Sequence, residues 1–224
     1  CKKNYPGVVY CFDVVNECVD DGTGDDSVNW NCRTTFNGGD NFWYATMGTD
    51  YVEKAFTYAR KYAEKGMKLI YNDYNVYVPA NLVKGLKEKN LIDGIGLQPT
   101  VDLYNPDELK GDSYDSFENC LKKYAELNVD IQITELSFKI DEETGERDEK
   151  SLKRQADRYQ EMFELLKKMD TASGGPCNIT SVTVFGICDD YPLYDDLVQC
   201  LYLWDKNAKP KESFYRVREV GESK

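Results

Sequence analysis

The sequence predicts an α/β protein built on a parallel sheet. Short apolar runs rich in Val and Ile alternate with longer segments of helical periodicity along the 224 residues. Polar or amide side chains follow the apolar runs, where the carboxyl ends of strands would lie. Five strands are expected, all parallel, because helix-length connections join each one to the next.

The first predicted strand spans residues 8–17 and follows a Pro6-Gly7 turn. Its residues are almost all apolar or aromatic, which is typical of a strand buried on both faces. The run ends in an amide and a carboxylate, Asn16 and Glu17. A buried parallel strand that presents polar groups at its carboxyl end is a common way to build an enzyme site.

Four further strands follow in order. They span residues 68–71, 92–98, 130–135 and 181–187. The first of these four leads into Asn72-Asp73-Tyr74-Asn75, and the third ends on a second glutamate, Glu135. Two carboxylates at the ends of separate strands suggest paired acid and base chemistry, for which glycoside hydrolysis is the best-known use.

Helices are predicted between the strands and after the last one. The first begins at Asp50, with Glu53 completing a pattern like a capping box, and stops at Gly66. The others cover 79–89, with Pro in the first turn, 113–127, 149–169 and about 211–220. The charged stretch 141–149 is interpreted as a solvated surface loop.

Composition limits the classes of partner. The formal net charge of −12 argues against DNA, RNA and anionic membranes, because phosphate binding depends on Lys and Arg. No apolar run approaches the roughly 20 residues of a membrane span. The sequence has no histidine and no CxxC pattern, so we expect neither a metal nor a cofactor. A neutral polymer such as a polysaccharide stays compatible with this charge.

Eight cysteines at irregular spacings leave two readings open. They are either disulfides of a secreted enzyme or buried reduced thiols, and the second fits Cys11 and Cys188 in apolar strands. The chain opens at Cys1 rather than Met, so we expect the natural start to lie outside it. We expect an extracellular protein, with little weight placed on the sequon at Asn178.

Five motifs together resemble glycoside hydrolase family 10, the endo-β-1,4-xylanases. The stretches that resemble the family's fourth to eighth strands are 12–17, 71–75, 94–98, 133–136 and 185–189. The resemblance implies a (β/α)8 TIM barrel, of which residues 1–224 form the carboxyl-terminal portion of one catalytic domain. The first three strands are not in this chain. We expect them on a separate or cleaved amino-terminal segment; the alternative is a truncated or decayed barrel.

The resemblance also implies roles for individual residues. Glu17 would be the acid/base and Glu135 the nucleophile of a retaining mechanism on xylan. Asn16, Gln98, Tyr74, Asn75, Thr100 and Phe185 would bind the sugar. Taken singly, a glutamate after a strand is more often a solvated or capping residue, Asn75 a turn former and Tyr74 a core residue. The aromatic residues Trp30, Phe42, Trp43 and Tyr44 would line a sugar groove or pack a long loop, with equal weight.

The chain departs from the family pattern at two linked positions. Thr100 replaces a usual His, and Ser137 replaces a usual Asp that hydrogen-bonds with it and with the nucleophile. We interpret the paired change as one network replaced by a neutral hydroxyl pair. Phe12 and Phe185 replace tryptophans and lose two indole N–H donors. Two alternatives to a xylanase stay open: a non-catalytic β-glycan-binding barrel remnant, and a related hydrolase of another β-1,4-glycan.

Overall fold

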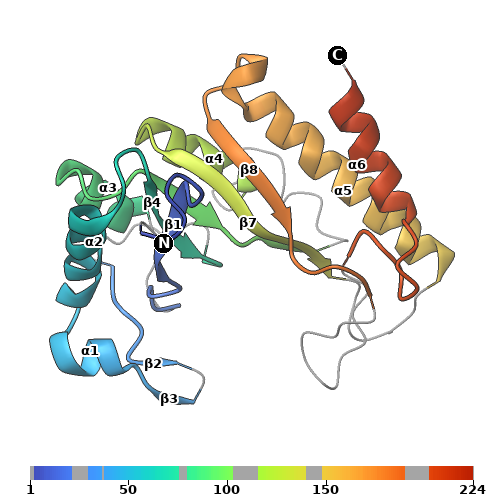
Figure 1. The fold of residues 1–224 in the computed structure, drawn as a ribbon. Helices are drawn as coiled ribbons and strands as arrows, with labels where there is room; N and C mark the ends of the chain where they lie inside the picture. Colours follow the sequence, from blue (N-terminus) through green and yellow to red (C-terminus); the bar gives the residue numbers. More distant parts are fainter. Residues whose placement is uncertain are drawn as a thin grey trace. The chain divides into compact units, whose positions relative to one another are not determined.

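The computed structural model describes residues 3–21, 30–36, 38–75, 80–102, 116–139, 148–189 and 202–223 (Figure 1). The chain divides into two compact units, each described by itself below. The first holds Cys1–Gln98 with Glu126–Gln132, and the second holds Pro99–Ala125 with Ile133–Lys224. The predicted loop at 141–149 falls almost wholly outside the described residues.

The first unit contains three of the predicted strands in parallel register. β1 (Cys11–Asn16) pairs with β4 (Lys68–Asp73), and β4 pairs with β5 (Gly94–Leu97). β5 is followed in the sheet by the start of β7 (Asp130–Lys139), whose Asp130 N–H donates to the Asp93 carbonyl at 3.0 Å. Gly94 is required here, because a Cβ atom would lie 2.6 Å from the Asp130 carbonyl oxygen.

β1 contradicts the predicted burial. Val15 is its only buried residue, and Phe12 is 52% exposed, whereas five of the six residues of β4 are buried. The physical reason is position: among the described residues β1 pairs only with β4 and forms the edge of the sheet. The expectation of a strand covered on both faces is therefore wrong for this structure.

The helices of the first unit largely match their predictions. α2 (Asp50–Tyr62) buries Val52 and Phe56, and α3 (Ala80–Glu88) buries a face of Leu and Val. The predicted cap at Asp50 is wrong: Thr49 occupies the N-cap position, without a side-chain cap bond. The helix ends at Tyr62, and Gly66 turns the chain beyond it with a φ of 90°.

The long segment between β1 and α2 contains a hairpin and a short helix. β2 (Thr35–Phe36) and β3 (Gly39–Asp40) pair antiparallel, and α1 (Phe42–Met47) follows. Asn41 caps α1, because its side chain accepts the Tyr44 N–H. None of these three elements was predicted from the sequence.

The second unit is built on the rest of β7. A short strand not predicted from sequence, β6 (Thr100–Asp102), pairs parallel with it, and β8 (Asn178–Val184) lies beside it in the same direction (Figure 1). β8 begins and ends three residues before its predicted bounds of 181–187. The Phe185 N–H, just beyond β8, donates to the Leu136 carbonyl at 3.0 Å.

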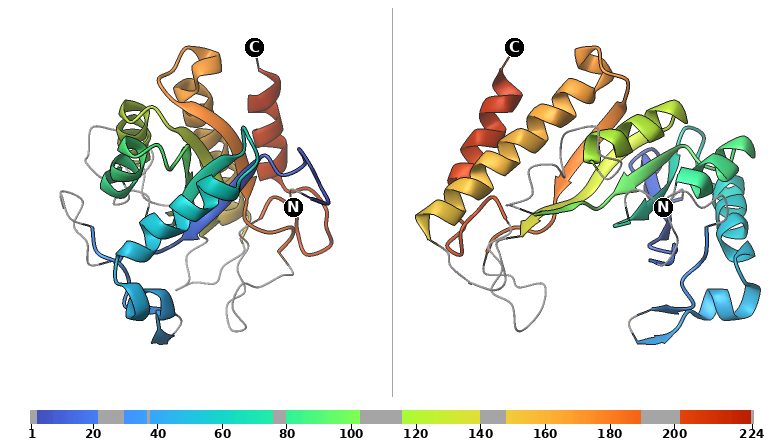
Figure 2. Two further views of the ribbon diagram at one scale, coloured as in Figure 1. Left: turned by 60° about the vertical axis from the view of Figure 1, so that its left-hand side comes forward. Right: turned by 180° about the vertical axis from the view of Figure 1, so that it is seen from behind.

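Three α-helices and a 3-10 turn complete the second unit as described. They are α4 (Phe117–Glu126), α5 (Glu149–Met169), the 3-10 turn Thr171–Ser173 and α6 (Glu212–Glu222). α5 matches its predicted bounds, and α5 and α6 lie side by side in both views of Figure 2. The Tyr159 ring of α5 packs on Phe138 of β7, with the ring centroids 4.3 Å apart.

None of the helices within the described residues combines the length and apolar character that a membrane crossing needs.

Candidate active site

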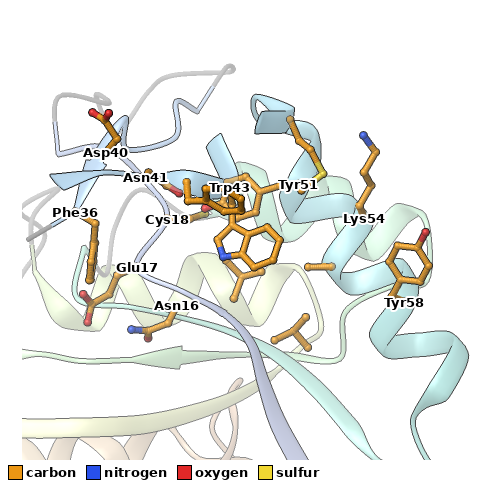
Figure 3. Close-up of a pocket in the computed structure, with 15 residues that line it drawn as sticks. Asn16, Glu17, Cys18, Phe36, Asp40, Asn41, Trp43, Tyr51, Lys54 and Tyr58 are labelled. Carbon is orange, nitrogen blue, oxygen red and sulfur yellow. The ribbon is translucent and has the colours of Figure 1, made fainter. Parts of the chain in front are cut away.

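Glu17 stands directly after β1 and lines a hollow of about 900 Å³ in the first unit (Figure 3). Its backbone is left-handed, with a φ of 51°, which costs an L-residue roughly 1–2 kcal/mol. Such strain persists only where surrounding structure enforces it, and it is concentrated at functional sites. Asn16 lines the same hollow. The predicted pair of polar residues at this strand end is thus placed together.

Aromatic side chains form much of the wall of this hollow. Phe36, Phe42, Trp43 and Tyr58 all line it, and Trp43 is 58% exposed (Figure 3). Exposed rings of this kind offer flat apolar faces for a ligand. Of the four aromatic residues singled out in the sequence, Phe42 and Trp43 line the hollow, whereas Trp30 and Tyr44 are not among its lining residues.

Hydrogen bonds from β4 hold the backbone around Glu17. The Tyr71 hydroxyl accepts the N–H groups of Cys18 at 2.9 Å and Val19 at 3.2 Å. The Glu17 N–H donates to the Asn72 carbonyl at 2.8 Å, and the Asn72 amide donates to the Asn16 side-chain oxygen at 2.8 Å. These bonds compensate the strained turn, hold the backbone that carries Glu17 and fix the Asn16 side chain.

The Asp73 carboxylate accepts the hydrogen bond that holds the Tyr71 hydroxyl in place. The Asn75 N–H donates to the other carboxylate oxygen of Asp73 at 2.8 Å. The Asp73 side chain is fully buried, and burial raises its pKa to about 6 in spite of these donors. We call Tyr71, Asp73 and the peptide N–H groups of Cys18 and Val19 the Tyr71 framework.

The remaining candidates of the first unit have partners within the protein. The Tyr74 hydroxyl is 3.0 Å from Asp21, and the Arg33 guanidinium lies 4.6 Å above its ring. Asn75 uses its backbone N–H in a turn with Asp73, as the turn-former reading predicts. Gln98 is buried, and its N–H donates to the Asp73 carbonyl at 3.0 Å. Their sugar-binding roles stay predictions.

The other candidates lie in the second unit. Glu135 is half-buried on β7, and Ser137, two residues on, is buried. Ser137 and Thr100 are register partners, and the Ser137 hydroxyl donates to the Thr100 hydroxyl at 3.2 Å. The two hydroxyls therefore contact each other, and their role as a neutral replacement for a charged network stays a prediction. Phe185 is half-buried just after β8.

Gly186, next to Phe185, cannot be replaced without strain. Its φ is 96°, and a Cβ atom would collide with the Tyr202 ring. Further along, Lys211 forms a nearly buried ion pair with Asp189 at 3.0 Å. These contacts hold Gly186 and Asp189 in place within the second unit.

Glu17 and Glu135 belong to different units, so their convergence stays a prediction. Sequence reasoning also missed the Tyr71 framework, because Tyr71 was taken only as part of a buried strand. A signal was available: Tyr71 and Asp73 are two apart on β4 and so share one side of it, and a buried tyrosine hydroxyl needs a hydrogen-bond partner.

The part of the chain that the structure describes contains no cluster of metal ligands. No group of three or more His, Cys, Asp or Glu side chains in that part of the chain is placed to hold an ion.

Comparison with known proteins assigns the class. The model of glycosyl hydrolase family 10 matches residues 1–220. A sequence-predicted endo-1,4-β-xylanase of Caldicellulosiruptor saccharolyticus is 56% identical over 228 residues, covering 99% of this chain and 69% of that protein. The chain therefore belongs to glycosyl hydrolase family 10, and the predicted (β/α)8 barrel class, with about five strands supplied here, is confirmed.

Solved structures agree. An endo-1,4-β-xylanase from Caldicellulosiruptor owensensis has a TM-score of 0.72 at 32% identity, covering 94% of this chain and 62% of that chain. The intracellular xylanase of Thermoanaerobacterium saccharolyticum, as a glutamate-to-alanine mutant with xylotetraose, has a TM-score of 0.76 at 29% identity, covering 96% and 60%. A second glutamate-to-alanine mutant of that enzyme was solved with xylotriose. The chain spans about three-fifths of these solved relatives.

Proposed function

We propose that this chain is the carboxyl-terminal part of a retaining endo-β-1,4-xylanase that cleaves internal bonds of xylan. The observation that carries the proposal is Glu17: it stands at the end of β1 in a strained backbone held by dedicated hydrogen bonds, beside Asn16 and an aromatic hollow. Family membership and the xylo-oligosaccharide complexes of relatives support the substrate class.

The mechanism assigns opposite tasks to the two glutamates. Glu17 would give a proton to the leaving glycosidic oxygen and then take one from the incoming water. Glu135 would attack the anomeric carbon and form a glycosyl ester, which that water hydrolyses with net retention. Retention needs the two carboxyl groups about 5–5.5 Å apart, so we propose that β1 and β7 direct them across a gap of that size.

Other residues would bind and orient the sugar. Asn72 occupies the Asn16 oxygen, which leaves the amide nitrogen of Asn16 to donate to a sugar hydroxyl near the reacting carbon. Gln98, Tyr74, Asn75, Thr100 and Phe185 would complete the sugar-binding surface. The hydroxyl pair of Ser137 and Thr100 would support the nucleophile in place of a charged network, and more weakly than one.

The exposed edge strand β1 supports a second part of the proposal. An uncovered parallel edge with half-exposed aromatic residues needs a neighbour in the working enzyme. We propose that the amino-terminal strands of the same barrel, on another segment, pair with β1 and complete the cleft. The share of the solved relatives left unmatched is consistent with this.

The test uses the complete protein with Glu17→Gln and Glu135→Gln, and with Glu53→Gln, at an exposed position of α2, as the matched control. We expect reducing-sugar release from xylan to fall roughly 10²–10⁴-fold for Glu17→Gln and further for Glu135→Gln. Glu53→Gln should retain wild-type release, because its carboxylate only meets surface Lys89. Full activity in either site variant would overturn the proposal.

Activated aryl xylosides distinguish the two roles. A leaving group that needs no proton should restore the glycosylation step in Glu17→Gln but not in Glu135→Gln. NMR of the first product formed by the wild type should show the β anomer. An α anomer would overturn retention while leaving hydrolase activity intact.

The Thr100–Ser137 pair favours one competing function, a non-catalytic glycan-binding protein. Calorimetry with xylo-oligosaccharides on the wild type, across pH, separates the two. Heat of binding without product formation would favour the binding protein. A panel of β-1,4-glucan, mannan and xylan would identify a related hydrolase of another β-1,4-glycan. We also propose secretion, for which an extracellular fraction assay is the test.

A further inference from the structure

Cys18 and Cys32 lie on two short backbone segments that run antiparallel beside the candidate acid/base. Val19 and Cys32 form an antiparallel bridge. On either side of it, the Asp20 N–H donates to the Asn31 carbonyl at 2.8 Å and the Arg33 N–H donates to the Cys18 carbonyl at 2.8 Å. These three contacts hold the two cysteine positions next to each other.

The two thiols contact each other in a buried environment. Cys18 is 2% exposed and Cys32 is 4% exposed. Both are free thiols in this structure, and they lie close enough for each to shift the pKa of the other. Buried Tyr51 adjoins both thiols. The contact therefore joins the segment that carries Glu17 to the segment that carries Cys32 and Arg33.

The environment makes the two sulfurs chemically unequal. The hydrogen bond from Cys18 lowers the pKa of the Cys32 thiol, whereas burial raises the pKa of the Cys18 thiol. The two thiols of the folded protein therefore differ in acidity, as do the two partners of pairs that undergo thiol–disulfide exchange.

A packing role and a metal-binding role each explain less of the position of these two cysteines. Single buried cysteines act as small apolar residues, as Cys177 does when its thiol meets the Leu121 carbonyl. Cys18 and Cys32 instead lie on two segments joined by the Val19–Cys32 bridge, each thiol close to the other. A metal site would need a third ligand, and the described residues offer no such cluster.

We infer that Cys18 and Cys32 form a disulfide that ties the backbone following Glu17 to the returning segment at Cys32–Arg33. The Cys32 thiolate attacks one sulfur of a small-molecule disulfide of the glutathione type and releases one small thiol. The Cys18 sulfur, losing its proton, then attacks Cys32 and releases the second. Two cysteine thiols are oxidised, and the external disulfide is reduced to two thiols.

The disulfide closes the loop from residue 18 to residue 32. Closing a loop of this length removes conformations from the unfolded chain and stabilises the native one. Because burial limits access in the folded protein, the bond forms during folding. This inference does not rest on the proposed hydrolase activity, since its readouts are mass and thermal stability.

The test refolds the complete protein in a buffer of reduced and oxidised glutathione, alkylates free thiols and digests without reductant. Cleavage before aspartate separates the cysteines into peptides 13–19 and 26–39. We expect these peptides joined, lighter than their sum by two hydrogens. Cys11→Ser is the matched control and should keep the link, because Cys11 contacts Gln132 rather than a thiol.

Thermal denaturation gives a second readout. We expect a reductant to lower the Tm of the oxidised wild type and of Cys11→Ser by about 5 °C, and to leave the double variant Cys18→Ala/Cys32→Ala unchanged. If the double variant does not fold, the peptide map of the wild type still decides. Alkylation of both sulfurs after oxidative refolding, with no joined peptide, would overturn the inference.

Discussion

β1 and β4 are hydrogen-bonded neighbours of similar apolar character, yet they differ in burial. Ile70 of β4 is fully buried, and its register partner Asp13 and the adjacent Phe12 lie on an open strand. The apolar sequence of a strand is suited to burial, whereas its exposed surface depends on which neighbours pack against it. Among the described residues, β4 has a strand on each side and β1 has one on a single side. The difference teaches that β1 has the composition of an interior strand without the cover of one.

The largest effect should come from removing apolar side chains on the two strands in the complete protein. Ile70→Ala should cost about 2–5 kcal/mol of unfolding free energy in urea denaturation, because it leaves a cavity. If an amino-terminal segment covers β1, Phe12→Ala should cost a similar 3–5 kcal/mol. A cost for Phe12→Ala of less than about 1 kcal/mol would show that β1 stays an open edge.

The next effect concerns the charge buried at the end of β4. Since the folded pKa of Asp73 is about 6, against 3.8 for a carboxyl exposed to water in the unfolded chain, its proton stabilises the folded state. That stability is complete below about pH 4 and is lost as pH rises through 6. The shift corresponds to about 3 kcal/mol.

Asp73→Asn tests this sign directly. The wild type minus variant difference in unfolding free energy should fall by about 2–3 kcal/mol between pH 4 and pH 7. Denaturant melts at intervals of half a pH unit would measure it. A difference that stays constant across this range would contradict a buried, titrating Asp73.

Tyr71→Phe should have a moderate effect on stability and a further one on the site. Without the hydroxyl, the N–H groups of Cys18 and Val19 lose their acceptor, at a cost of roughly 1–3 kcal/mol. Exposed Tyr10→Phe, just before β1, is the matched control and should cost almost nothing. If Tyr71 positions Glu17, kcat on xylan should fall while KM changes little; equal stability of the two variants would argue against the framework.

The smallest effect on folding should come from the aromatic wall of the hollow above β1. Trp43→Ala removes an exposed ring, so the unfolding free energy should change by less than about 0.5 kcal/mol. On the proposed function, KM for xylo-oligosaccharides should rise roughly fivefold through lost stacking. An unchanged KM would show that the Trp43 ring does not contact the substrate.

Much of the fold could be predicted where local signals are strong. α5 matches its predicted bounds because a helical stripe of apolar residues runs between an Asp148 cap and the Gly174-Gly175-Pro176 break. β6 escaped prediction because its three residues carry no periodicity and depend on pairing with β7. The burial of β1 could not be judged, since it is decided by neighbours distant in sequence.

The candidate site also has parts that could be predicted from the sequence and parts that could not. Asn16 and Glu17 could be found because polar residues end an apolar strand. The Tyr71 framework and the contact between Cys18 and Cys32 could not, because both join segments whose approach depends on the course of an intervening loop. The Thr100–Ser137 contact was accessible only through the paired departure from a family pattern.

The Tyr71 hydroxyl also makes the end of β1 depend on the interior of the first unit. Because the N–H groups of Cys18 and Val19 both donate to it, a substitution that moves the Tyr71 ring should also move the backbone that carries Glu17. Buried positions around Tyr71 therefore offer a way to alter the hollow from a distance, without changing a residue that lines it.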